Sequence, residues 1–445
     1  MKTRLIYCLV YFIAASYSNL AFADDESFDF SVGEEEQAPS SQPSTVPFSL
    51  PGDLQLSFDA GRQLQKPARW MQLGPEARLL LSTFTRLGNL NFESYARYNF
   101  AYQAEGDDKS LVDDESFDAQ VNELFLQKSS NQVTVTTGLV KLAWGVGDLV
   151  SILDVISPRD NREFLNTKPK DQRIGQLVVG VDYWFTNFES SSLSFLVIPR
   201  PQNSLSPHHQ HPYSLNTIAL PQQNPHPSPE GAIRFKKEGG SMSLGVYYAN
   251  IHERDLFIKT GDVPEQPFVL FYPHKKFMGL DFTYNLSPVL FKAEFVMEDS
   301  KAFQGEETVA NNTVIMDTYY ISSKGLMLGL DFNDDQWGSF SLEGRHWFLS
   351  DRRGVHIGVI QRSLGGAFWS KNFYRDEIRA SIGASFLGNI QDILSILNIE
   401  YSPRDNWIYN VKYSYLDFKT SEEPFASMDA WDRIQLGVKY NFDMR

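Results

Sequence analysis

The stretch Arg433-Ile-Gln-Leu-Gly-Val-Lys-Tyr-Asn-Phe442 alternates between polar or small residues and apolar residues without a break. Every second position carries an apolar or aromatic side chain, namely Ile434, Leu436, Val438, Tyr440 and Phe442. A period of two predicts a β-strand with one apolar and one polar face. Such a strand suits a transmembrane β-barrel, where one face contacts lipid and the other a wet lumen. For this segment alone, the alternative is an edge strand of a soluble sandwich.

The segment from Gln435 to Phe442 also resembles the C-terminal β-signal of bacterial outer-membrane barrels. That signal has a polar residue, a glycine two positions later, and two aromatic residues spaced by one, here Tyr440 and Phe442. The resemblance implies that the outer-membrane assembly machinery is a partner of the C-terminal strand. The tail Asp443-Met444-Arg445 departs from the family pattern, in which chains commonly stop at the final aromatic residue.

The N-terminal end predicts export. Residues 1–23 have the form of a secretory signal peptide, with basic residues at the start, an apolar stretch, and a cleavage site after Ala23. The only cysteine, Cys8, lies inside this signal, so we expect a mature protein without thiols or disulfides. Residues 24–47 contain seven acidic residues and no basic ones, followed by a Pro/Ser-rich run, and we expect a disordered periplasmic segment there. The barrel would occupy residues 48–445.

The remaining chain predicts an all-β, antiparallel transmembrane barrel. The predicted strands are mostly 9 to 14 residues long, as a tilted strand needs to cross a bilayer. Short periplasmic turns would alternate with longer extracellular loops. The predicted strands number about eighteen, although sixteen is an alternative because 52–60 and 356–369 are weakly patterned: 52–60, 77–87, 90–103, 116–128, 131–144, 174–186, 190–199, 231–237, 241–252, 275–285, 288–300, 324–333, 337–348, 356–369, 373–387, 391–401, 405–418 and 431–442.

The polar faces of these strands carry charges of both signs. A Lys or Arg facing lipid at mid-bilayer costs about 2–4 kcal/mol, so we expect the charged side chains to point into the lumen. The residues predicted to line the lumen are Glu93, Arg97, Lys292, Glu294, Glu343, Arg345, Glu377, Arg379, Lys412 and Lys439. The alternative is a solvated lumen whose mixed charges pair without selecting a solute.

The connection after the strand 131–144 is unusually apolar for an exposed loop, with Leu149, Val150, Ile152 and Leu153 close together. We expect it to fold into the barrel, with its apolar half on the wall. Its polar residues, together with the turn residue Pro158, would then form the constriction of the channel: Asp148, Asp154, Pro158, Arg159, Asp160, Arg162 and Glu163. The alternative is a structural loop that plugs or braces the barrel.

Within this loop, Trp144-Gly-Val-Gly-Asp148 and Leu153-Asp-Val-Ile-Ser-Pro-Arg-Asp160 resemble motifs of a porin-like Gram-negative outer-membrane family of unknown function that is associated with lipid-type exporters. The resemblance covers roughly residues 140–165 and is only architectural elsewhere. It implies passage of a substrate, with a hydrophobic substrate as one option, and an exporter as a partner. It implies no catalytic residues.

Two other site classes receive weak support. His208, His209 and His211 lie in one Pro-rich loop and are the only candidate metal ligands, but no carboxylates cluster beside them. His346 alternates with Ser339 and Ser341, which places the histidine on the opposite strand face and excludes a hydrolytic set. We therefore predict no enzyme and no cofactor.

Together these features predict a channel in the outer membrane of a Gram-negative cell, in contact with outer-membrane lipids. The net charge of −15 argues against nucleic acid as a partner. Two alternatives remain open at this stage. One is a largely plugged barrel that handles a hydrophobic or lipid-like substrate with an export pump, and the other is a non-conducting structural protein.

Overall fold

The computed structural model describes residues 52–65, 70–101, 116–162, 172–186, 190–206, 228–263, 266–309, 313–350, 355–388, 392–404, 406–419 and 431–444. The predicted signal peptide and acidic segment lie outside these ranges, as do Glu163 and the three candidate histidine ligands. Among the described residues, no helix is long and apolar enough to cross a membrane.

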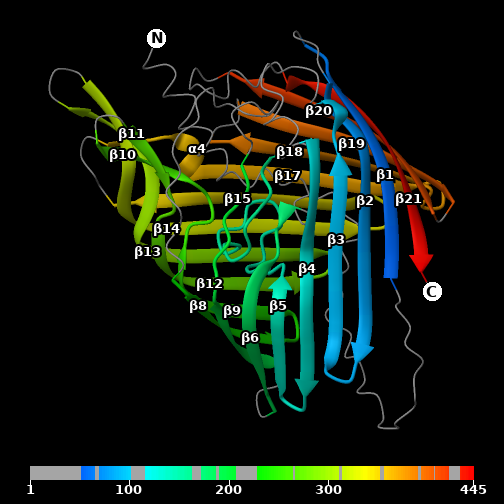
Figure 1. The fold of residues 1–445 in the computed structure, drawn as a ribbon, viewed down its shortest axis with the longest axis horizontal. Coiled ribbons are helices and arrows are strands. Elements are labelled where there is room, and N and C mark those ends of the chain that lie inside the picture. The colour runs from blue at the N-terminus through cyan, green and yellow to red at the C-terminus, as the bar shows by residue number, and fades with distance from the viewer. Residues whose placement is uncertain are drawn as a thin grey trace.

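Eighteen antiparallel strands of 8 to 22 residues form a closed barrel (Figure 1). The first nine are β1 (Gly52–Gln63), β2 (Trp70–Thr85), β3 (Gly88–Tyr98), β4 (Phe117–Ser130), β5 (Val133–Val140), β6 (Gln176–Phe185), β7 (Ser191–Ile198), β8 (Glu230–Gly239) and β9 (Met242–His252). The other nine are β12 (His274–Leu286), β13 (Val289–Val309), β14 (Thr313–Asp334), β15 (Gly338–Leu349), β17 (Ser363–Phe373), β18 (Ile378–Leu387), β19 (Asp392–Arg404), β20 (Trp407–Phe418) and β21 (Arg433–Met444).

Three smaller elements accompany the barrel. Strands β10 (Phe257–Val263) and β11 (Gln266–Phe271) form a separate hairpin. The short β16 (Val355–Ile357) pairs with the distal part of β13, and the single-turn helix α4 (Val359–Arg362) follows it. The sequence predicted no strands at β10 or β11, and its single predicted strand 356–369 covers β16, α4 and the first part of β17.

The barrel closes where the first and last strands meet. β1 pairs with β21 over their whole length, from Gly52 opposite Met444 to Gln63 opposite Arg433. Both chain ends of the barrel therefore lie at the end where the short turns are, as an even strand number requires. Closure leaves no unpaired edge, which is the condition for a sheet to span lipid.

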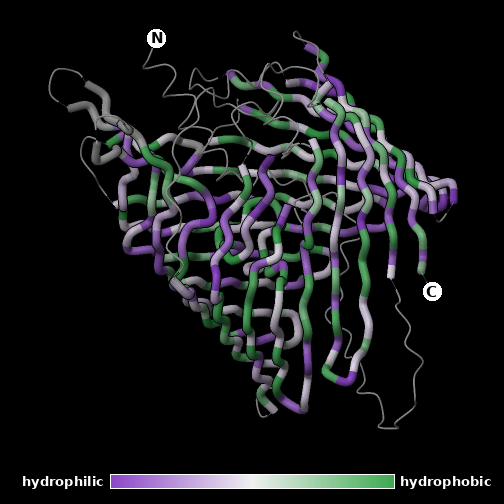
Figure 2. The backbone as a smooth tube through the Cα atoms, in the orientation of Figure 1, coloured by the Kyte–Doolittle hydropathy of each residue, from purple (hydrophilic) through white to green (hydrophobic). Residues whose placement is uncertain are grey.

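The two faces of the strands differ as the alternation predicts, and Figure 2 shows hydrophobic and hydrophilic residues alternating along them. On β21, Arg433 and Gln435 are buried inside the barrel, whereas Ile434 and Leu436 are exposed on the outer wall. Near the short-turn end, Trp407 and Tyr440 pack ring against ring at 4.8 Å, and Tyr440 packs on Phe442 at 4.3 Å. Such an aromatic group is typical of the membrane interface.

Each of the eighteen predicted strands corresponds to one strand of the barrel, but several differ in extent, and β2 begins at Trp70 instead of residue 77. Residues 301–323 were predicted as a loop, whereas β13 continues to Val309 and β14 begins at Thr313. The two strands pair with each other throughout this extension. β5 is shorter than predicted and ends at Val140. Its predicted last residues instead turn into the lumen, where the Lys141 amide donates to Glu123 at 2.8 Å.

Candidate functional site

The segment after β5 leaves the wall and enters the interior of the barrel, where residues 141–162 are described (Figure 1). We call residues 144–162 the lumen loop. It contains no regular helix or strand, and only Arg159 and Asp160 form isolated β-bridges. Gly145 adopts a φ of +87°, a backbone conformation that favours glycine and lets the chain turn. A loop of this kind must find hydrogen-bond acceptors outside itself for its buried N–H groups.

Glu294 on β13 supplies acceptors for one half of this need. One carboxylate oxygen accepts the N–H groups of Val146 at 2.7 Å and Gly147 at 2.8 Å. The other accepts those of Ile152 at 2.7 Å and Leu153 at 3.1 Å. The Ser151 hydroxyl adds contacts to both oxygens at 2.9 and 3.0 Å. Both parts of the loop therefore bind the single side chain of Glu294, which is only 1% exposed.

Glu343 on β15 holds the segment between those two groups of donors. Its carboxylate accepts the N–H groups of three consecutive residues, Asp148, Leu149 and Val150, at 2.8 to 3.0 Å. Successive N–H groups that point at one anion form a backbone nest, a concave arrangement that favours negative charge. Glu294 and Glu343 were predicted from the sequence as lumen lining, and in the structure they bind the lumen loop.

Lys292 on β13 neutralises part of the negative charge of this region. Its ammonium lies 2.7 Å from Asp331 and 2.9 Å from Glu343, and it also contacts Asp148. These three carboxylates offer oxygens within 4.8 Å of one another, a spacing that would suit a metal ion. Because the lysine ammonium already contacts all three, the arrangement is an ion-pair cluster. Asp148 is the exposed member, with 45% of its side chain accessible.

The apolar side chains of the lumen loop pack against the wall. Leu149, Val150, Leu153 and Ile156 are at most 3% exposed and belong to one hydrophobic cluster. Inward-facing wall residues complete this cluster, among them Tyr247, Phe303, Met327, Trp347 and Leu364. This packing agrees with the expectation that the apolar half of the loop lies on the wall, and it places the apolar core inside the barrel.

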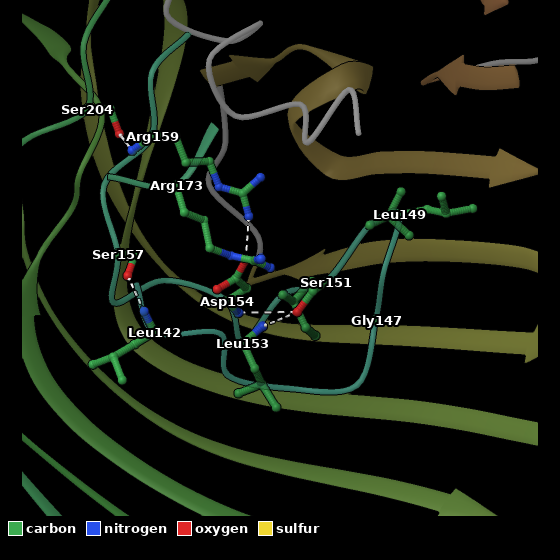
Figure 3. Close-up of polar contacts among 12 residues, drawn as sticks. Leu142, Gly147, Leu149, Ser151, Leu153, Asp154, Ser157, Arg159, Arg173 and Ser204 are labelled. Carbon is green, nitrogen blue, oxygen red and sulfur yellow. Dashed lines mark hydrogen bonds and ion pairs between the residues drawn. The ribbon is translucent and has the colours of Figure 1, made fainter. Parts of the chain in front are cut away.

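The far half of the loop is held by arginine–carboxylate pairs. Arg159 and Arg173 converge on one oxygen of Asp154, at 2.6 and 2.8 Å (Figure 3). Asp160 binds Arg162 at 2.7 Å and Arg97 on β3 at 3.3 Å. Burial alone would raise the pKa of Asp160, but the hydrogen bonds and charges of these arginines lower it below its usual value. The loop therefore connects the wall at β3 with the wall at β13 and β15.

The remaining predicted lining residues occupy other parts of the wall. Glu93 on β3 binds Lys141 at 2.8 Å, and Arg345 on β15 reaches the Ser151 carbonyl at 3.4 Å. Glu377 belongs to the turn after β17, whereas the others sit on strands of the last third of the chain: Arg379 on β18, Lys412 on β20 and Lys439 on β21. Pro158 accepts a backbone hydrogen bond from Ile174 at 2.8 Å.

Sequence reasoning missed several residues of this site. Asp331 lies on the predicted strand 324–333, and Asp118, which binds Arg162 at 2.7 Å, lies on the predicted strand 116–128. Both could have been found by extending the inward-facing parity along those strands. Arg173 and Ser151 carry no periodic signal, because both lie in irregular chain.

No protein-family model matches the chain, and no curated protein matches it. Solved structures do share its fold. OccAB1 of Acinetobacter baumannii is 8% identical with a TM-score of 0.52, covering 89% of this chain and 97% of that one. OccK8 (OprE) of Pseudomonas aeruginosa is 9% identical with a TM-score of 0.51, covering 90% of this chain and 100% of that one. These structural neighbours are Gram-negative outer-membrane porins. The chain has the porin fold. At these identities, the likeness carries no information about a solute.

Proposed function

We propose that the protein is a non-enzymatic channel of the Gram-negative outer membrane, through which solutes diffuse along a polar lumen narrowed by the lumen loop. The observation that carries this proposal is the course of the loop, which leaves the wall after β5 and is bound on the far wall by Glu294 and Glu343. A loop fixed in this position would reduce the cross-section of a barrel wide enough for an aqueous channel.

Charge would then set the preference of the channel. Asp154 and Asp160 are buried in pairs with arginines, so their fields are largely compensated. Asp148 is exposed and shares the single Lys292 ammonium with Asp331 and Glu343, so one positive charge faces three carboxylates. We expect the remaining negative potential to favour cations and neutral solutes modestly. The polar lining residues of β18, β20 and β21 would form the opposite side of the path.

The decisive test is single-channel conductance of the purified, folded protein in a planar bilayer under a salt gradient. We expect discrete steps with a reversal potential that leans toward cations, and Asp148→Asn should reduce that preference. Asp335→Asn, in the exposed turn after β14, is the matched control and should leave it unchanged. Deletion of residues 148–163 should enlarge the steps. A folded wild-type protein that carries no current would refute the channel and favour a structural barrel.

The second candidate is a barrel that handles a hydrophobic or lipid-like substrate with an exporter as partner. It rests on the resemblance of residues 140–165 alone. The apolar side chains of the described lumen loop are buried against the wall, so they do not form an exposed hydrophobic surface for a substrate. We therefore rank it below the channel. Co-purification of an exporter or a bound lipid with the folded protein would reverse this order.

The location and partners follow from the same proposal. The outer wall presents apolar side chains such as Leu328, Leu342 and Leu436, each more than half exposed, which would contact outer-membrane lipids. The C-terminal strand would be read by the outer-membrane assembly machinery after removal of the signal peptide near Ala23. Cleavage at that site would appear as an N-terminal Asp24 in the mature protein.

A further inference from the structure

Two histidines lie opposite each other where the connection between β9 and β12 begins and ends. His252 is the last residue of β9, His274 is the first of β12, and the register of the two strands pairs them directly. The Glu253 N–H donates to the Pro273 carbonyl at 2.7 Å, so the next pair along the strands occupies a non-hydrogen-bonded position. Side chains approach each other most closely at such positions. The fold therefore brings together two imidazoles that are separated in the sequence by the whole connection.

The separation of the two rings suits one shared metal ion. Their centroids lie 5.1 Å apart, and the ring planes are inclined at 75°. Two imidazoles that bind one ion through nitrogens at about 2.0–2.1 Å, with a tetrahedral angle between the bonds, have ring centres roughly 5 Å apart. His252 keeps 13% of its side chain accessible and His274 is exposed, so an ion can reach the pair from solvent. The exposed His274 ring is also free to turn a nitrogen toward the ion.

Glu230 on β8 determines which nitrogen of His252 is available. Its Oε1 accepts the His252 backbone N–H at 2.8 Å and lies 2.9 Å from the ring Nδ1. Because this carboxylate also forms an ion pair with Arg254 at 2.6 Å, it is ionised and only accepts, which assigns a proton to Nδ1. The Nε2 of the neutral ring then carries the lone pair, and it has no hydrogen-bond partner among the described residues. A carboxylate behind a histidine is the arrangement that orients metal-binding imidazoles.

The surroundings of the pair supply a further acceptor. Asn250, two positions before His252 on β9, has a buried side-chain oxygen without a hydrogen-bond partner in the part of the chain that the structure describes. The period of two along a strand places it on the face of His252, where it can accept a hydrogen bond from a metal-bound water. Two cations lie nearby. Arg254 is compensated by Glu230, and Lys276 is exposed, so water and salt screen its charge.

We propose that His252 and His274 bind one divalent transition-metal ion of the class of Zn²⁺, Ni²⁺ and Cu²⁺, with water completing the coordination. Neutral imidazole is a ligand for these ions, whereas Mg²⁺ and Ca²⁺ prefer oxygen. The bound ion would link β9 to β12 at the base of the connection that carries β10 and β11. The inference goes beyond the proposed channel and does not depend on it, because metal binding can be measured without a current.

Isothermal titration calorimetry with Zn²⁺ tests the proposal on the folded protein in detergent, prepared without a polyhistidine tag. In this background protein, glutamine replaces the four histidines of the connection after β7, because they could bind the ion themselves: His208, His209, His211 and His226. We expect one Zn²⁺ per chain, tighter binding of Cu²⁺, and no displacement of Zn²⁺ by excess Mg²⁺. A folded background protein that binds no Zn²⁺, or that loses it to Mg²⁺, would overturn the proposal.

Variants then locate the ion. His252→Gln and His274→Gln should each raise the Kd for Zn²⁺ roughly 10-fold or more, since even the loss of an outer-shell partner has an effect of about this size. His356→Gln, at an exposed histidine on β16, is the matched control and should leave the Kd unchanged. Electron paramagnetic resonance of bound Cu²⁺ should show two imidazole nitrogens in the background protein and one in His274→Gln.

The exposed position of His274 makes its variant the deciding one if His252→Gln does not fold. Unchanged Zn²⁺ affinity in a folded His274→Gln protein would place the ion elsewhere and refute the assignment.

Discussion

The substitution Glu294→Gln tests whether a wall carboxylate holds the lumen loop in place. The exchange preserves shape but turns one acceptor oxygen into an NH₂ donor. Each oxygen of Glu294 accepts two backbone N–H groups, so two of them, either those of Val146 and Gly147 or those of Ile152 and Leu153, lose their acceptor. An unsatisfied buried donor costs about 1–3 kcal/mol, which gives about 2–6 kcal/mol for the pair.

This cost should appear as local opening of the loop while the barrel remains folded. Since 1.4 kcal/mol corresponds to a factor of ten, the lower bound of about 2 kcal/mol predicts roughly 30-fold faster amide exchange. Hydrogen–deuterium exchange of peptides that cover residues 144–158 measures this directly. Glu298→Gln on the same strand is the control, because that carboxylate forms an ion pair with Lys301 at 3.6 Å.

The reasoning is refuted if the amides of residues 146–153 exchange at the wild-type rate in a folded Glu294→Gln protein. Such a result would mean that packing of the apolar side chains alone fixes the loop. Faster exchange across the whole barrel would show that the variant unfolds globally. The exchange rates would then report on the stability of the barrel instead of on the position of the loop. Only selective acceleration within residues 144–158 supports the carboxylate as the anchor.

Three further changes have defined outcomes. Lys292→Met leaves the three carboxylates that this lysine contacts without their shared cation. We expect this variant to lower the free energy of unfolding by about 3–5 kcal/mol. An unchanged urea midpoint would contradict this. Burial, and then the charge of Glu253, raise the pKa of Asp255 to about 6 against the lowering effects of a Ser204 hydrogen bond and nearby cations. The folded state thus binds the proton more tightly than the unfolded state, and wild-type stability should fall by on the order of 3 kcal/mol as the pH rises from about 4 to about 7. Asp255→Asn should remove this dependence in urea unfolding at several pH values. Gly145→Ala should detach the loop and accelerate its amide exchange, because φ is +87° and a Cβ would lie 2.9 Å from Leu153 Cβ.

The barrel could be predicted from the sequence because its information is local. Most strands repeat the alternation seen in 431–442, because lipid on the outside and a polar lining on the inside select opposite residue types at successive positions. The predicted strand boundaries were wrong where a strand continues without the alternation or ends before the alternation does. In residues 301–323 the pattern is interrupted by acidic residues and Gly305, yet β13 and β14 remain paired there because each supplies the other with hydrogen bonds. β5 ended early because Glu93 and Glu123 capture Lys141.

The site was predictable only in part, because the residues that bind the lumen loop are far from it in the sequence. The run of Leu149, Val150, Ile152 and Leu153 indicated that the loop packs inside, since an exposed run of this kind would be costly. The residues that receive it could not be identified, because Glu294 and Glu343 lie 141 to 195 positions away along the chain from the amides they bind. Their meeting depends on the curvature and register of a closed barrel, which no local pattern encodes.

The choice of carboxylates as anchors has a consequence for how the lumen loop behaves. Two side chains satisfy seven backbone N–H groups, four at Glu294 and three at Glu343, in a segment without regular secondary structure. Moving the loop would leave both carboxylates buried without their hydrogen-bond donors. Any partly displaced position of the loop is therefore higher in free energy than the bound position. A loop held this way acts as a fixed partition. The channel should therefore show one steady open level instead of graded closure by the loop.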